Sequence, residues 1–395
     1  MSNAAFWVLW CFVFVLPWDV LTKLPVVGSI PRLVGLAASA VCVLYILARR
    51  RVRPPSWFHL FALLFVLWAG ATSLWSVDPE ATWTVFLTYL QLLVLVWLIW
   101  EIAWSPDRQH ALLRAYVLGA SVAALVTIHN YLSGVTIPGV HVGVNAVRFT
   151  ALNQDVNELG LTLALGLPMA WDVSLSQARG AWSWRLYLPL AITAILLTGS
   201  RGAVLTGLVG LSIIPWTLRR MRLRTKVALY ALAAGSLVLA SYLVPNASLA
   251  RIASTRADIE AGYFGGRVPV WLAGLEVARE HPLVGVGAGG YQEAVEPTIH
   301  QEMVAHNVLL SILVEDGTVG LLLFVAMLAA LLTPLRHVPS FQRRLSIVLF
   351  LTLAVGSMAL SWDHRKQFWF VLGVLAAQAA QPTARRTLPR PITAS

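Results

Sequence analysis

Apolar runs separated by short polar breaks extend through most of the chain and limit its fold more than any other feature. A helix needs roughly 20 apolar residues to cross the hydrocarbon core of a membrane, so each long run is a candidate crossing. Twelve runs lie at about 4–22, 33–48, 57–75, 84–104, 111–134, 157–174, 184–199, 202–218, 227–244, 307–333, 344–362 and 367–381. Only 12% of the residues are charged and the mean hydropathy is +0.73. We predict an all-α polytopic membrane protein with about twelve transmembrane helices.

The stretch from Trp184 to Leu218 is too long for one crossing, and a polar break divides it. The break reads Thr198-Gly199-Ser200-Arg201-Gly202, a composition typical of a tight turn at a membrane face. We therefore expect two helices joined by a turn that holds Arg201.

Basic residues are distributed unevenly over the two sides that alternating helices define. One side receives 19 of the 29 Lys and Arg residues, and the positive-inside rule assigns that side to the cytoplasm, with both termini on it. The net charge of +11 is then mainly an orientation signal, and the basic run 219–226 is a cytoplasmic loop. No nucleic-acid partner is expected. Cys11 and Cys42 fall inside apolar runs, so no disulfide is implied.

The longest outer loop, 245–306, is expected to be a mostly helical domain. Amphipathic stretches such as 268–279 alternate in it with glycine-rich turns. The predicted organisation is nine helices over 1–244, the loop domain over 245–306, three helices over 307–381 and a cytoplasmic tail over 382–395. The glycine run 285–290 is interpreted as a turn that permits close backbone packing, since no Lys-Ser/Thr pair or nucleotide-binding unit accompanies it.

Two arginines and one histidine are the residues best suited to chemistry on the outer side. Arg201 and Arg267 each offer a planar fork of donors that matches phosphate oxygens. His306 titrates near neutrality and precedes an apolar segment. Structural alternatives remain open: each arginine can reach lipid headgroups, and the histidine can serve as a hydrogen-bonded interface residue.

Other polar residues of the outer side are weaker candidates. Glu296 and Glu302 are possible bases, and His141, His281 and His300 rank lower. The acids show no metal-ligand spacing, so we expect a metal-independent site without a cofactor. Before the sixth helix, Asp155, Asn157 and Arg148 can contact a substrate, although Asp155 or Asn157 can equally cap that helix. Glu315 and Asp316 would lie deep in a continuous helix, and a short re-entrant segment ending near Gly317 would instead leave His306 in a surface cavity.

Four sequence elements resemble the bacterial O-antigen ligases, within the superfamily that also holds O-antigen polymerases and protein O-oligosaccharyltransferases. The elements are Arg148-Phe149 followed by 153–158, Thr198-Gly-Ser-Arg201-Gly, Gly266-Arg267 with Trp271, and His306-Asn307. In the last one, nine residues separate Asn307 from Gly317, and two more precede Gly320, as in the ligase pattern. The resemblance covers roughly residues 60–380.

The resemblance implies a membrane C-type glycosyltransferase fold and a metal-independent, inverting reaction. The donor would be a glycan on undecaprenyl diphosphate, and the acceptor the lipid A core oligosaccharide, at the periplasmic face of the bacterial inner membrane. His306 would act as general base, Arg201 and Arg267 would hold the diphosphate, and Asn307, Arg148 and Trp271 would help to bind substrate. Membrane lipids are the remaining expected partners.

Three other functions compete with ligation. An O-antigen polymerase is the nearest, since Arg279 and Gly290 provide a loose polymerase-like spacing. A protein O-oligosaccharyltransferase would normally have a further soluble region for which this chain has no room. A transporter would be expected to place charges near the middle of the membrane in paired, broken helices, whereas the polar candidates here gather at one face.

Overall fold

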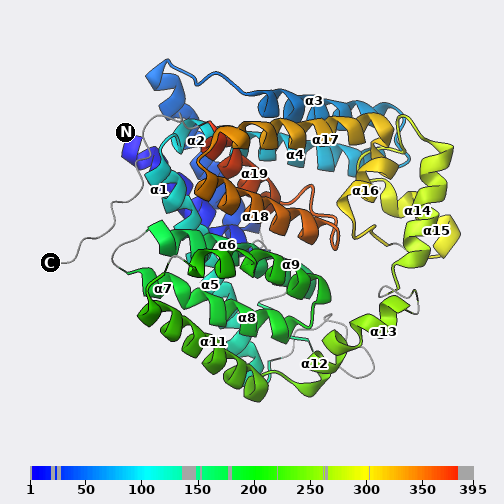
Figure 1. The fold of residues 1–395 in the computed structure, drawn as a ribbon. Coiled ribbons are helices and arrows are strands. Elements are labelled where there is room, and N and C mark those ends of the chain that lie inside the picture. Colours follow the sequence, from blue (N-terminus) through cyan, green and yellow to red (C-terminus); the bar gives the residue numbers. More distant parts are fainter. Residues whose placement is uncertain are drawn as a thin grey trace.

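Long apolar helices form the body of the molecule (Figure 1), and the computed structural model describes residues 2–18, 23–24, 28–135, 148–151, 154–176, 180–219, 221–260, 262, 266–301 and 303–380. The first helices are α1 (Ser2–Val15), α2 (Ile30–Arg49), α3 (Trp57–Ala71), α4 (Pro79–Ile102), α5 (Pro106–Leu132) and α6 (Val156–Ser176). They are followed by α7 (Ala181–Arg185), α8 (Tyr187–Thr198), α9 (Arg201–Leu211), α10 (Ile213–Leu218) and α11 (Leu223–Leu243). After the cap described below come α17 (Gly317–Leu332), α18 (Ser340–Ser357) and α19 (Lys366–Ala379).

Short elements complete the body. Three 3-10 turns lie at Leu16–Trp18, Thr72–Leu74 and Thr333–His337, and two antiparallel strands, β1 (Lys23–Leu24) and β2 (Gly28–Ser29), form a minimal hairpin. Nine helices of the described part are long and apolar enough to cross a membrane. The other three expected crossings correspond to α1, α18 and α19, which are shorter or more polar and pack within the same bundle. The all-α polytopic prediction is confirmed.

The core lies where α6 is surrounded by α5, α8, α9 and α18. Nearly every α6 residue from Leu159 to Ser174 is buried, and Trp171 is fully enclosed. By contrast, α11 has a single buried residue, Ala240. An apolar helix with so little protein around it is stable in lipid, because its backbone polar groups bond within the helix.

Helix starts in the bundle follow local capping rules. Asp78 accepts a hydrogen bond from the Ala81 N–H at 3.0 Å and is followed by Pro79, which begins α4. Ser105 and Pro106 begin α5 in the same way. Proline suits the first helical position because the missing N–H would have no intrahelical partner there.

A cap of short helices covers one end of the bundle (Figure 1). It consists of α12 (Asn246–Ala253), α13 (Thr255–Glu260), α14 (Val268–Glu280), α15 (Tyr291–Ile299) and α16 (Val308–Glu315). The last three share a separate small hydrophobic core around Val270, Tyr291, Val295 and Val314. The helical character expected for this loop is therefore present.

Two glycines permit close packing of the cap. A Cβ at Gly287, whose φ is 106°, would lie 2.2 Å from the Ser76 Oγ of the bundle, and one at Gly285 would lie 2.4 Å from the Glu315 carbonyl oxygen within the cap. The run 285–290 thus permits close backbone packing, in agreement with the sequence interpretation.

Candidate functional site

The turn between α8 and α9 presents Arg201 at the end of the bundle that carries the cap. Gly199 ends α8 with φ 59°, and Ser200 caps α9 by accepting a hydrogen bond from the Ala203 N–H. Arg201 is therefore the first residue of α9. Its Nε donates to the Arg251 carbonyl oxygen at 3.0 Å and its Nη2 to the Ser254 Oγ at 3.3 Å. The predicted turn is confirmed, and it is tied to the end of α12.

Arg148 lies over the same turn. Its Nε donates to the Thr198 carbonyl oxygen at 2.8 Å, and its Nη2 donates to the Asn157 Oδ1 at 2.9 Å. The pKa of Arg148 is lowered to about 10, mainly by burial and then by the positive charges of Arg251 and Arg201, which the carboxylate of Asp155 partly offsets. Arginines concentrated in this way favour the arrival of an anion, because it relieves their mutual repulsion.

On the cap side, one tryptophan joins Arg267 to His306. Arg267 immediately precedes α14, and its carbonyl oxygen accepts from the Trp271 N–H at 2.9 Å. The Trp271 Nε1 donates to the Ala305 carbonyl oxygen at 2.8 Å. The peptide before His306 is therefore fixed one helical turn from Arg267.

The His306 backbone adopts the left-handed conformation, with φ 49°. A non-glycine residue adopts this conformation at an energetic cost, and such residues concentrate at functional sites. Asn307 follows as the cap of α16, and its Oδ1 accepts from the Leu309 and Leu310 N–H groups at 3.1 and 3.2 Å. The Asn307 side chain thus has a structural role that the sequence pattern did not indicate.

The His306 ring is a neutral imidazole in this environment. The pKa of His306 is lowered to about 4, mainly by desolvation and also by the charge of Arg267, while the carboxylate of Asp155 opposes both effects. The buried Nδ1 has no hydrogen-bond partner among the described residues. A neutral ring with an unused acceptor is suited to taking a proton.

Asp155 connects the two sides of the site. It interacts electrostatically with His306 and Arg267 on the cap and with Arg148 on the bundle. Its Oδ1 also accepts from the Asn157 and Glu158 N–H groups at the start of α6, at 2.8 and 3.0 Å. Sequence reasoning treated Asp155 as a helix cap or a substrate contact. The structure shows the capping role and adds a central electrostatic position.

The structure therefore assembles the candidates in two groups that share Asp155. Arg148 and Arg201 form the bundle group, and Arg267, Trp271 and His306 form the cap group. No direct contact between Arg201 and His306 is found in the described part of the chain. Arg201 and His306 are therefore linked only indirectly, through Asp155 and Arg148.

The weaker candidates lie elsewhere. His281 and His300 end α14 and α15, and His281 and Glu296 are exposed. His141, Asn153 and Glu302 fall outside the described residues.

Glu315 and Asp316 are buried within protein beneath the cap. α16 ends at Glu315, and α17 begins at Gly317, whose φ is 67° and whose Cβ, if present, would lie 2.3 Å from the Leu283 carbonyl oxygen. Burial raises the pKa of Glu315 to about 7 and that of Asp316 well above its usual range. The negative charge of Asp363 contributes to raising the pKa of both acids. Its Oδ2 accepts a hydrogen bond from the Tyr89 hydroxyl at 2.5 Å. The sequence analysis missed Asp363, since nothing local distinguishes it.

Fold and site together define a polytopic α-helical membrane protein whose cap holds a histidine and an arginine, linked electrostatically through Asp155 to the arginines at a turn of the bundle. Residues 186–325 match the family model described as O-antigen ligase. The chain is also 27% identical over 298 residues to the exopolysaccharide production protein ExoQ of Rhizobium meliloti (strain 1021). That alignment covers 68% of this chain and 63% of the relative's length. Both similarities are to proteins of surface-polysaccharide production, and the family model places the likeness to O-antigen ligases in residues 186–325.

The matched region begins at the end of α7 and runs into α17. It therefore contains Arg201, Arg267, Trp271 and His306, while Arg148 and Asp155 precede it. These last two residues join the site only through the fold.

Proposed function

We propose that this protein is a periplasmic-face glycosyltransferase that moves a glycan from undecaprenyl diphosphate to the lipid A core oligosaccharide. The observation that carries the proposal is His306, whose strained backbone, unpartnered buried nitrogen and neighbouring Arg267 form a base beside an anion site. The ligase-type spacing from His306 to Gly317 and Gly320 supports the same conclusion.

The reaction is a single displacement at the anomeric carbon. The acceptor hydroxyl oxygen forms a bond to that carbon while the bond to the diphosphate oxygen breaks, so the configuration inverts. His306 accepts the hydroxyl proton, and general-base assistance of this kind typically contributes about 10² to 10⁴ in rate. The donor bond supplies the driving force, and the proposed reaction requires neither a metal nor a cofactor.

Arg267 and Arg201 stabilise the negative charge that develops on the departing diphosphate. Fixed donors directed at developing charge commonly contribute about 10² to 10³ in rate. Arg148 and Trp271 shape the site around them, the former at the turn and the latter through the peptide before His306.

Asp155 stabilises the imidazolium that His306 becomes after proton transfer. Its carboxylate already favours the protonated form of the ring. A bound diphosphate adds negative charge beside Arg267, so donor binding raises the pKa of His306 toward the ambient pH. The base is consequently stronger in the complex than in the free enzyme.

Polymerisation is the second candidate, and the similarity to a protein named for exopolysaccharide production favours it. The donor and the proposed catalytic groups would be the same, while the acceptor would be a glycan on a second lipid carrier. Deletion of the gene separates the two functions. Loss of a ligase leaves lipid A core without any repeat unit, whereas loss of a polymerase leaves core capped by a single unit.

A purified assay tests the proposed reaction directly. Full-length protein is mixed with undecaprenyl-diphosphate glycan and rough lipopolysaccharide, with and without a chelator. Product in both samples is the expected result. Failure to transfer glycan to rough lipopolysaccharide, with transfer to lipid-linked glycan intact, would replace ligation by polymerisation.

A further inference from the structure

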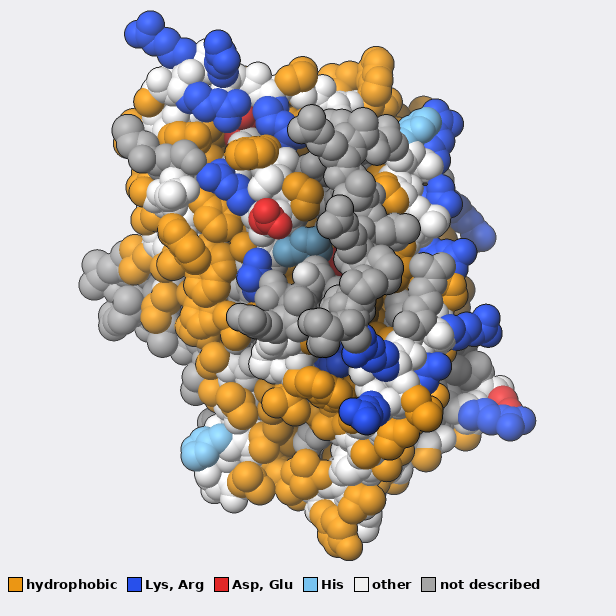
Figure 2. Space-filling view, turned by 60° about the vertical axis from the view of Figure 1, so that its left-hand side comes forward, with side chains coloured by type: hydrophobic (Ala, Val, Ile, Leu, Met, Phe, Trp, Pro, Cys, Tyr) orange, Lys and Arg blue, Asp and Glu red, His pale blue; other side chains and the backbone are white. Residues whose placement is uncertain are grey.

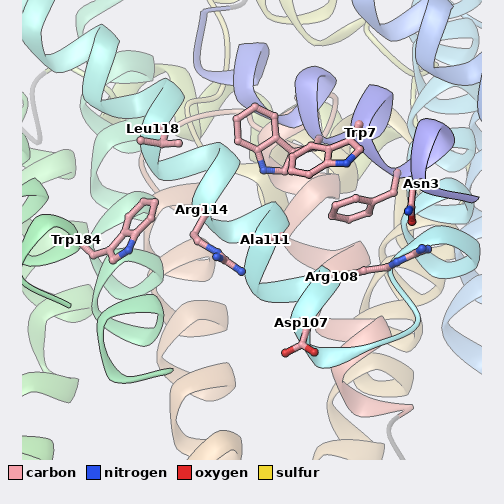
Figure 3. Close-up of a pocket in the computed structure, with 10 residues that line it drawn as sticks. Asn3, Trp7, Asp107, Arg108, Ala111, Arg114, Leu118 and Trp184 are labelled. Carbon is pink, nitrogen blue, oxygen red and sulfur yellow. The ribbon is translucent and has the colours of Figure 1, made fainter. Parts of the chain in front are cut away.

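A groove of about 550 Å³ opens between α1, α5 and α7 (Figure 3). It lies at the end of the bundle opposite the cap (Figure 1), far from the candidate active site. Among the residues that line it are Trp7, Trp10, Arg108, Arg114, Leu118 and Trp184. We call it the α1–α5 groove. Its volume is that of an ordinary small-molecule site.

Along the groove, charged residues come first and apolar residues follow, which matches the succession of headgroup and acyl chain in a phospholipid. Asp107 and Arg108 lie in the first turn of α5, Arg114 follows about 9 to 10 Å further along the axis, and Leu118 about 6 Å beyond Arg114. The 27 residues of α5 span about 40 Å, against a hydrocarbon core of about 30 Å. The helix is therefore longer than the hydrocarbon core, and its charged first turns suit the headgroup layer, whereas Leu118 suits the hydrocarbon.

Two arginines of α5 line the groove at different levels, and only Arg114 has its guanidinium free of the α4–α5 turn. The Arg108 Nη1 donates to the Ile102 carbonyl oxygen at 2.9 Å, and its guanidinium lies 5.1 Å from the Phe6 ring centroid. The Arg114 Nε donates to the His110 carbonyl oxygen at 3.3 Å, and Arg114 makes no ion pair with a described residue. Figure 3 shows its terminal nitrogens in the groove. A phosphate at this level would receive charge-assisted hydrogen bonds.

Aromatic rings form the deeper wall. Trp7 is 56% exposed, and Trp10 and Trp184 flank the groove from α1 and α7. Tryptophan is enriched where headgroups meet acyl chains, because its ring is apolar and its N–H is polar. These rings suit an acyl chain that continues past Leu118.

Asp107 determines which headgroup fits. Its exposed carboxylate lines the same groove at the outermost level. An anionic headgroup would be repelled there, whereas an ammonium group would be paired. On the face shown in Figure 2, Lys and Arg side chains are more numerous than Asp and Glu.

The geometry points to a specific site for a zwitterionic phosphoethanolamine phospholipid, with its phosphate at Arg114, its amine at Asp107 and an acyl chain against the tryptophans. The protein would retain this lipid through purification. The site is separate from the proposed catalytic groups, so a test of lipid binding there does not depend on the proposed function.

Native mass spectrometry of delipidated full-length protein, titrated with phosphatidylethanolamine or phosphatidylglycerol, tests the site. Phosphatidylethanolamine is expected to bind the unaltered protein more tightly. Arg114→Gln is expected to weaken its binding about tenfold, as the loss of one charged hydrogen bond implies. Asp107→Asn is expected to remove the preference for phosphatidylethanolamine, and millimolar inorganic phosphate is expected to leave the bound lipid in place.

Two further variants keep the test decisive. Ala111→Phe fills the groove without changing charge and is expected to abolish the specific adduct. Arg224→Gln, which alters an exposed arginine on α11 outside the groove, is the matched control and is expected to bind like the unaltered protein. The proposal is overturned if Arg114→Gln and Ala111→Phe bind as the control does, if Asp107→Asn keeps the headgroup preference, or if phosphate alone displaces the lipid.

Discussion

The two sides of the candidate site differ in how far their polar groups are already satisfied. On the bundle side, Arg148 donates to Thr198 and Asn157, and Arg201 donates to Arg251 and Ser254. On the cap side, the side chains of Arg267 and His306 have no hydrogen-bond partner among the described residues, although both residues are half-buried. The bundle side is therefore held in position in advance, while the cap side has donors and an acceptor left for a substrate.

Removing the proton-accepting ring of His306 from the cap side should have the largest effect on glycan transfer. His306→Ala is expected to reduce glycan transfer by at least about 10² to 10⁴, the usual contribution of a general base. The measurement is lipopolysaccharide banding in a strain without its own ligase, together with protein level. His281→Ala, which alters an exposed histidine of the same cap, is the control. Normal long-chain product with His306→Ala would exclude this residue from the mechanism.

Replacing each arginine by lysine compares the two sides directly. Arg267→Lys is expected to lower the transfer rate on the order of 100-fold, because lysine keeps the charge but loses the fork of donors. Arg201→Lys is expected to cost roughly tenfold, because two of the Arg201 nitrogens are already bonded to the protein. Rates measured with purified variants test this order. Near-normal activity of both variants would indicate simple lipid contacts.

The pH dependence of kcat/KM should report the protonation of His306. The neutral ring is the active form, and the pKa of His306 is lowered to about 4 in the free protein. The kcat/KM value should therefore stay level from pH 8 to about 5 and fall as the pH drops toward 4. Asp155→Asn removes a charge that raises this pKa, so the acidic limb should move to lower pH and the rate should fall. An acidic limb near pH 6.5 in the unaltered protein would contradict the burial of the ring.

A smaller effect is expected from loosening the link between Arg267 and His306. Trp271→Phe retains the aromatic ring but loses the hydrogen bond to the Ala305 carbonyl oxygen. A net loss of about 1 kcal/mol corresponds to roughly fivefold in kcat, with KM for the donor little changed. Trp182→Phe, an exposed tryptophan on α7, is the control. An unchanged kcat would show that the backbone of His306 is held by other contacts.

The smallest effect concerns Asn307, where a structural and a binding role can be separated. Asn307→Ala removes the cap of α16 and is expected to cost about 1 kcal/mol of stability, whereas Asn307→Ser keeps a capping oxygen. Thermal unfolding in detergent measures the first effect and transfer assays the second. A stable but inactive Asn307→Ser variant would assign Asn307 to substrate binding.

The sequence allowed most of the bundle to be predicted. Every apolar run corresponds to a helix, and the break at 199–200 divides α8 from α9 as expected. Near the cap, hydropathy alone joins α16 and α17 in one apolar run, whereas the break near Gly317, which was considered because Glu315 and Asp316 would otherwise lie deep in a helix, is present. A left-handed glycine between two apolar helices leaves little trace in hydropathy.

The candidate site was only partly predictable. Local patterns singled out His306, Arg201 and Arg267, because a titratable or charged residue at the end of an apolar run is unusual. They did not indicate that Asp155 interacts with both sides of the site. Nor did they indicate the pairing of Asp363 with Tyr89, whose positions are 274 residues apart.

By itself the sequence determined the helices, their approximate limits and the residues able to perform chemistry. In lipid, backbone hydrogen bonds must close within each segment, so local composition is enough to specify a helix. Only the tertiary structure decided which of those residues meet. Arg201 reaches Arg251 across 50 positions and Trp271 reaches Ala305 across 34, and such contacts depend on how distant segments pack, which no local pattern encodes.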